Sequence, residues 1–250
     1  MTNGKMFEID ELQLYFGDPY IINEHISIIQ PTINDIILYG ESNYFSVIHS
    51  IVAIPSDMKS ILWDQMNLDW TELDDYELFM IMAQTLTPDK TSILFGDLDF
   101  SKLKPFKNKQ NDEIVLADVD TGVIIDKMIY LRIVTYLRKL HNMKKPKVEN
   151  AVNKITKKVL LDEDRDKVRL SKDKPFQSYL LPMISSVKVK QGYTKDYVRH
   201  MGLSEFFTEV TRLQIIDQAD HLLNGVYCGM ADLSKVNKKN FDWMRPIEEE

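Results

Sequence analysis

Apolar residues recur at three- and four-residue intervals over most of this chain, and that spacing predicts a mainly helical protein. In the range 127–141 the apolar side chains fall on one helical face. The same spacing runs through the range 33–53 and is interrupted at Gly40, which predicts one broken helix. Further helices are predicted over the ranges 55–66, 75–86, 149–170, 176–189, 194–201 and 204–223.

Alternating apolar and polar residues, which are typical of strands, are confined to short segments. The ranges 12–16 and 20–29 predict an N-terminal hairpin, because Gly17-Asp18-Pro19 between them favours a turn. Three more short strands are predicted, over the ranges 92–95, 113–117 and 122–125, the last two forming a hairpin. The expected fold is therefore α+β and predominantly α-helical, with an N-terminal β-hairpin and a small central β-hairpin attached to a helical body.

Charge is distributed unevenly along the chain. Residues 1–100 contain 17 Asp and Glu but 3 Lys and Arg, whereas residues 101–250 contain 21 acidic and 28 basic residues. The Lys144-Lys145-Pro146 segment favours a boundary near residue 145, with an acidic mixed α/β region over 1–145 and a helical region over 146–250, which together could also form one continuous domain. Regions of opposite charge can pair within one molecule, remain solvated or face partners, and the sequence leaves these alternatives open.

A basic patch is predicted at Lys144, Lys145, Lys157 and Lys158. These lysines lie in the range 127–158, which holds ten Lys and Arg and one acidic residue. Clustered cations can bind phosphates, but the segment has neither interleaved aromatic residues nor a helix-turn-helix pattern. Because the whole chain carries a net charge of -7, nucleic acid is not the partner that we expect.

Catalytic and metal-binding patterns are missing from the sequence. The five histidines include no pair at the four-residue spacing of a zinc-binding helix, and Cys228 is the only cysteine. The glycines are isolated, so no phosphate-binding loop is predicted. We therefore expect no catalytic residues, no metal site and no cofactor, and hence a protein that is not an enzyme.

The expected location is a cytoplasm. A single cysteine excludes an intramolecular disulfide and fits a reducing compartment. Residues 1–10 contain no apolar run typical of a secretory signal, and no apolar stretch approaches the roughly 20 residues of a membrane helix. We expect a soluble protein with no membrane partner.

The polar C-terminal tail contains Phe241, Trp243, Met244 and Arg245. Trp and Arg are common anchors in protein interfaces, which makes these four residues candidate partner-binding residues. The alternative is that the tail docks on the body of its own molecule.

Three parts of the sequence together carry a family resemblance. They are QPTINDIILYGE at 30–41; LDWTELDDYELF at 68–79 with FGDLDF at 95–100; and LSKVNKKNFDWMRP at 233–246. In this arrangement most of the chain resembles a family of proteins from tailed phages and prophages of Gram-positive bacteria. The family lies in structural gene modules and is loosely labelled as tail assembly proteins or chaperones.

The resemblance implies a non-enzymatic morphogenesis factor that acts in the host bacterial cytoplasm. Tail assembly chaperones keep the long tape measure protein soluble and help to recruit tail tube subunits, so these two phage proteins are the expected partners. The alternatives are a structural virion component (a baseplate, connector or tail subunit) and a regulator that binds nucleic acid or a host protein. Self-association into a homo-oligomer is a further expectation that the sequence leaves open.

Overall fold

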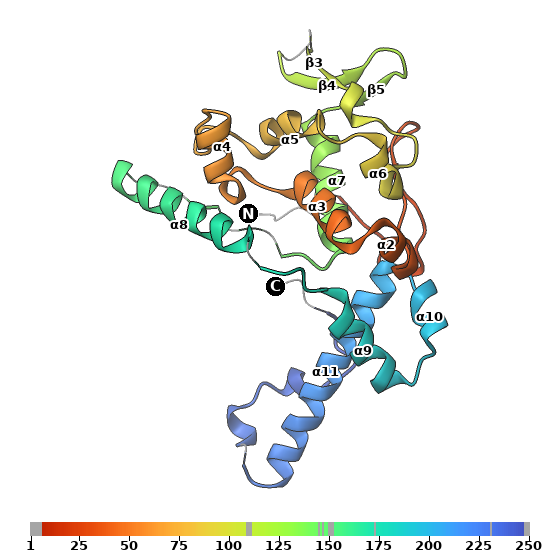
Figure 1. Cartoon of the computed structure of the whole chain (residues 1–250). Coiled ribbons are helices and arrows are strands. Elements are labelled where there is room, and N and C mark those ends of the chain that lie inside the picture. The colour runs from red at the N-terminus through yellow and green to blue at the C-terminus, as the bar shows by residue number, and fades with distance from the viewer. Residues whose placement is uncertain are drawn as a thin grey trace.

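The computed structural model describes residues 7–108, 112–144, 146, 148–149, 153–172, 174–230 and 232–247. Helices dominate this described part, and two small antiparallel sheets are attached to the helical body, so the predicted α+β fold class is confirmed (Figure 1). Within these residues, no helix combines the length and the apolar character needed to cross a bilayer.

The α-helices are α1 (Glu11–Phe16), α2 (Ile33–Tyr39), α3 (Glu41–Val52), α4 (Lys59–Gln65), α5 (Asp75–Ala83), α6 (Pro88–Phe95), α7 (Lys127–Leu140), α8 (Lys154–Lys172), α9 (Leu180–Gln191), α10 (Lys195–His200) and α11 (Leu203–Tyr227). The strands are β1 (Tyr20–Ile21), β2 (Ser27–Ile28), β3 (Lys104–Lys107), β4 (Ile114–Asp118) and β5 (Val123–Ile125). Short 3-10 helices in the described part of the chain are η1 (Pro55–Asp57), η2 (Phe100–Lys102), η3 (Leu233–Lys235) and η4 (Lys238–Phe241).

The N-terminal hairpin exists, but the strand predicted at 12–16 is wrong. That segment is helix α1, because the Asp10 carboxylate accepts hydrogen bonds from the first-turn amides and Gly17 ends the helix in a left-handed conformation. The hairpin consists instead of β1 and β2, which both lie inside the predicted second strand. A five-residue alternation is too short to distinguish a strand from one and a half helical turns.

The helix predicted at 33–53 is broken at Gly40, as expected, into α2 and α3. A capping box starts α2, in which the Thr32 hydroxyl accepts from the Asp35 amide at 3.2 Å. Gly40 has a φ of 96°, which residues with a β-carbon rarely adopt. The glycine thus lets the chain change direction between the two helices.

The central sheet has the strand order β3-β4-β5, with all neighbours antiparallel. Strands β4 and β5 confirm the predicted central hairpin, and β3 adds an edge strand that was not predicted. The strand predicted at 92–95 is wrong, because these residues form the end of α6. Pro88 at the start of α6 has the fixed φ that favours the first turn of a helix.

One main hydrophobic core joins the regions on both sides of residue 145. It contains Tyr44 and Phe79 from the first region and Leu203 and Phe206 from the second. Backbone hydrogen bonds also connect the two, for example from the Leu203 amide to the Pro31 carbonyl at 3.1 Å. The predicted boundary therefore lies between parts of the chain that share a core.

Several acidic residues of the first hundred pair with bases further along the chain. Ion pairs join Glu11 to Lys139, Asp74 to Lys127, Asp64 to Arg165 and Asp69 to Lys157. The hydrogen bond from the Arg165 guanidinium lowers the pKa of Asp64. Part of the acidic charge of residues 1–100 is thus paired with basic residues of the same molecule.

Candidate functional site

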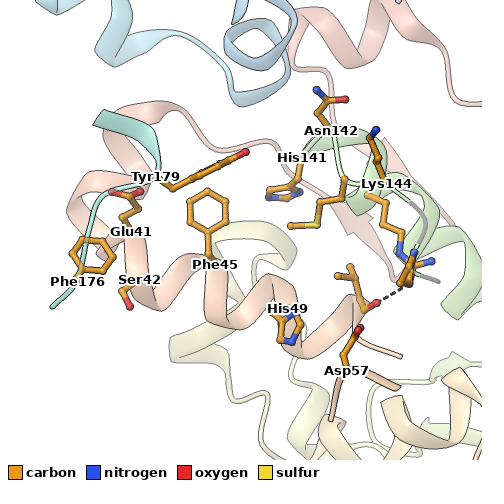
Figure 2. A pocket seen from close by; sticks show the side chains of 14 residues that line it. Glu41, Ser42, Phe45, His49, Asp57, His141, Asn142, Lys144, Phe176 and Tyr179 are labelled. Carbon is orange, nitrogen blue, oxygen red and sulfur yellow. Dashed lines mark hydrogen bonds between the residues drawn. The ribbon is translucent and has the colours of Figure 1, made fainter. Parts of the chain in front are cut away.

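A pocket of about 680 Å³ lies beside α3 (Figure 2). Its walls come from one face of α3, from the C-terminal end of α7 with the residues that follow, and from the segment that leads into α9. We call it the α3 pocket. Its volume lies within the range of roughly 300–1,000 Å³ that is common for ligand sites.

Helix α3 supplies one wall because its pocket-facing residues recur at helical spacing. Glu41, Phe45, His49 and Val52 follow one another at steps of four, four and three residues, and all line the pocket. Tyr44, which does not line the pocket, is fully buried in the core. Helix α3 therefore holds Phe45 and His49 at the pocket while its buried side chains anchor it in the core (Figure 2).

His141 forms the back of the pocket and holds α7 against α3. One ring nitrogen, Nε2, lies 2.8 Å from the Tyr44 hydroxyl, and Nδ1 lies 2.7 Å from the Leu137 carbonyl oxygen. Burial lowers the pKa of His141 to about 4, so the imidazole is neutral near pH 7. In the neutral ring Nδ1–H donates to Leu137 and Nε2 accepts from Tyr44. Both ring nitrogens are thus engaged within the protein, and His141 connects α3 with α7.

The third wall carries two aromatic side chains that extend into solvent. Phe176 is 64 % exposed and Tyr179 is 59 % exposed. The Tyr179 ring stands edge-on to Phe45 with the centroids 5.6 Å apart, so the two rings form a continuous apolar surface (Figure 2). These aromatic groups are large, rigid and accessible, which are the properties of interface anchors.

Glu41 fixes this aromatic wall in place. Its carboxylate accepts from the Ser178 hydroxyl at 2.6 Å and from the Leu180 amide at 2.8 Å. Helix α9 has no side-chain cap of its own at Tyr179, so a carboxylate from α3 performs that role. The first turn of α3 thereby determines where the chain enters α9.

Charged groups of both signs surround the apolar surface. Glu41 and Asp57 contribute carboxylates, and Arg138 and Lys144 contribute cations. The Arg138 guanidinium donates to the Val52 carbonyl at 2.7 Å. Its positive charge there offsets the partial negative charge of the last carbonyl groups of α3. An apolar surface with a mixed charged rim is suited to an amphipathic peptide.

Replacing Glu41 by alanine is expected to free the aromatic wall. Loss of the two hydrogen bonds should lower the free energy of unfolding by about 1–2 kcal/mol and accelerate amide exchange in the range 178–182. Hydrogen exchange read by mass spectrometry checks this, with Glu41→Gln as the matched control because its amide oxygen can still accept. Unchanged exchange in the alanine variant would show that Glu41 does not position this wall.

The predicted basic patch is divided between two places. Lys144 lines the α3 pocket, whereas Lys157 and Lys158 lie on α8, and Lys145 is outside the described residues. Lys158 is exposed, but the Lys157 ammonium bonds to the Asp69 carboxylate and the Thr71 hydroxyl. A phosphate-binding role for these lysines stays a prediction.

The C-terminal tail docks on α11, mainly through its backbone. Arg212 of α11 donates to the carbonyl oxygens of Trp243 and Arg245, each at 2.8 Å, and Phe241 is half-buried (Figure 1). The side chains of Trp243 and Met244 remain more than half exposed. Intramolecular docking therefore leaves these two side chains accessible, and their role as partner anchors stays a prediction.

The α3 pocket itself was not predicted from the sequence. Phe45 lies within the helix predicted at 33–53, and the helical spacing of Glu41, Phe45 and His49 was the one available signal. Among the described residues, no three His, Cys, Asp or Glu side chains gather as metal ligands, and Cys228 is exposed. In comparisons with known proteins, no protein-family model, curated protein or solved structure matches this chain.

Proposed function

We propose that this chain is a non-enzymatic phage morphogenesis factor, similar to tail assembly chaperones, that binds a helical segment of the tape measure or tail tube protein. The observation that supports binding is the α3 pocket, an accessible aromatic surface with charges of both signs at its rim. The assignment to tail assembly depends on the family resemblance of the three sequence segments described above.

A helix in this pocket would be held as in other helix-in-groove complexes. Apolar residues three and four positions apart on the bound helix lie about 5–6 Å from one another, so neighbouring ones can contact Phe45 and Tyr179. Charged residues on the bound helix would pair with the acidic and basic groups at the rim of the pocket, and this pairing would determine the direction in which the helix lies. A long helical protein such as a tape measure presents many segments of this kind.

The proposed role requires neither a cofactor nor a membrane, and the proposed location is the host bacterial cytoplasm. A chaperone releases its client when the tail is complete, whereas a baseplate, connector or tail subunit would stay in the particle. The two roles share the same pocket chemistry and differ in where the protein is found after assembly.

The binding test is co-expression with the tape measure or tail tube protein from the same genome, followed by affinity capture of this chain. We expect at least one of the two proteins to be captured and to remain soluble. Failure to capture either protein, with this chain folded and abundant, would contradict the proposed partners.

A further inference from the structure

Arg138 brings a half-buried positive charge to the wall of the α3 pocket. Its guanidinium donates a single hydrogen bond to the described part of the chain, from Nη2 to the Val52 carbonyl, and no described carboxylate forms an ion pair with it. A guanidinium carries several N–H donors in a planar fork, so most of them are available to a ligand. A charge that is partly removed from water is stabilised by a partner of opposite charge. The guanidinium is therefore placed to bind an anionic group that enters the pocket.

The carboxylates among the described lining residues already bind groups of their own chain. Glu41 caps α9, as described above, and Asp57 accepts from the Ile54 amide at 3.1 Å, which caps η1. Both carboxylates are thus used to hold helix ends in place. Lys144 lines the same wall as Arg138 and adds a second positive charge to it.

The C-terminal ends of α3 and α7 lie near this wall and act against a bound anion. Each helix end carries a partial charge of about −0.5 of an elementary charge, whereas Arg138 and Lys144 each carry a full positive charge. The two cations therefore outweigh the two helix ends. This wall favours a negatively charged group, although the whole chain has a net charge of -7.

The separation between the aromatic surface and Arg138 is set by α3. Phe45 contacts Tyr179, and Val52, seven residues further along α3, accepts the hydrogen bond from Arg138 (Figure 2). At a rise of about 1.5 Å per residue, Phe45 and Val52 lie about 10 Å apart along the helix axis, and after nearly two full turns they share one face. A second helix that lies along α3 has the same rise. Its residue on Phe45 and its residue at Arg138 are therefore also seven positions apart.

We propose that the α3 pocket recognises a helix in which a carboxylate lies seven positions from an apolar residue. The apolar residue packs on Phe45 and Tyr179, and the Arg138 guanidinium donates to the carboxylate. Hydrogen bonds between a guanidinium and a carboxylate are stronger than neutral ones and depend on direction, so Arg138 determines which helices bind. The inference rests on the proposed binding of a helix in this pocket, and it adds the chemistry by which the partner is selected.

The test compares two fluorescently labelled peptides of alanine and glutamine, each about 20 residues long so that it forms helix in water. The first carries a phenylalanine at its centre and a glutamate seven positions away on each side. The second has the same composition, but each glutamate is moved two positions towards the phenylalanine, which rotates it by about 200° to the far face of the helix. We expect the first peptide to bind the full-length chain at least about 5-fold more tightly than the second.

Arg138→Gln is expected to remove this difference, because the amide can donate a hydrogen bond but carries no charge. The matched control is Lys139→Gln. Lys139 is the next residue of α7, pairs with Glu11 at the surface and does not line the α3 pocket. This control loses the same charge and should keep the preference for the first peptide. Urea unfolding of both variants establishes that they are folded.

Equal binding of the two peptides to the unaltered chain would overturn this inference alone, since a helix would still bind the pocket. A preference that survives Arg138→Gln in a folded protein would overturn it as well. Binding of neither peptide would overturn it together with the helix-binding function proposed for the pocket. The comparison on the unaltered chain requires no substitution, so the test holds even when the Arg138 variant does not fold.

Discussion

Replacing Phe176 and Tyr179 together by aspartate is expected to weaken binding of the tape measure or tail tube protein by roughly 30-fold or more. Both side chains are more than half exposed, so the unbound chain loses little packing when they are removed. In the complex the partner would bury the new carboxylates next to Phe45. Removing a carboxylate from water without an opposite charge to pair with it costs free energy. A titration of each purified protein with the labelled partner measures the change.

The matched control is Val189→Asp. Val189 lies on α9, is 76 % exposed and does not line the α3 pocket. Its substitution therefore adds a charge to the helix that follows the aromatic wall, at a distance from the site. We expect this variant to bind like the unaltered chain. Partner binding that survives the double substitution, in a protein with unchanged circular dichroism, would place the partner site elsewhere.

Lowering the pH from 7.5 to 5 is expected to reduce the free energy of unfolding by about 2 kcal/mol through His141 alone. In the unfolded chain this imidazole takes up a proton near its ordinary pKa of 6.5, but in the folded chain burial delays protonation to about pH 4. Between these values the unfolded state binds more protons. The stabilisation is therefore complete above pH 6.5 and is lost progressively as the pH falls towards 4.

Urea unfolding of the unaltered chain and of His141→Gln, at pH 7.5 and at pH 5, measures this contribution. Staying at or above pH 5 keeps most carboxylates ionised, since free Asp and Glu titrate near about pH 4. We expect the glutamine variant to be less stable at pH 7.5 and to lose about 2 kcal/mol less on acidification. An identical pH dependence in the two proteins would show that His141 is not buried in its neutral form.

The sequence was most informative where a long segment repeats one pattern. The apolar spacing predicted α7 and the two helices on either side of Gly40, because each buries a continuous face in the core. It failed at 12–16 and 92–95, where segments of five and four residues were assigned as strands. In those places the caps Asp10 and Gly17 favour α1, and Pro88 favours the first turn of α6, which outweighs a brief alternation.

The candidate site could not be predicted, because its parts are distant in the chain. Tyr44 and His141 are separated by 97 positions, and their hydrogen bond depends on how α3 and α7 pack. Tyr179 contacts Phe45 across 134 positions of sequence, at the point where Glu41 caps α9. The charge pattern likewise left internal pairing and partner binding open, and the structure shows internal ion pairs, among them Asp69 with Lys157.

The most direct test of an assembly-chaperone role is to quantify this protein by mass spectrometry in purified phage particles and in the lysate of the same infected or induced cells. A chaperone that leaves the completed tail should be abundant in the lysate and absent from the particles. We predict that result for this protein. A stoichiometric amount in the particles would contradict it and would identify the chain as a structural component of the virion.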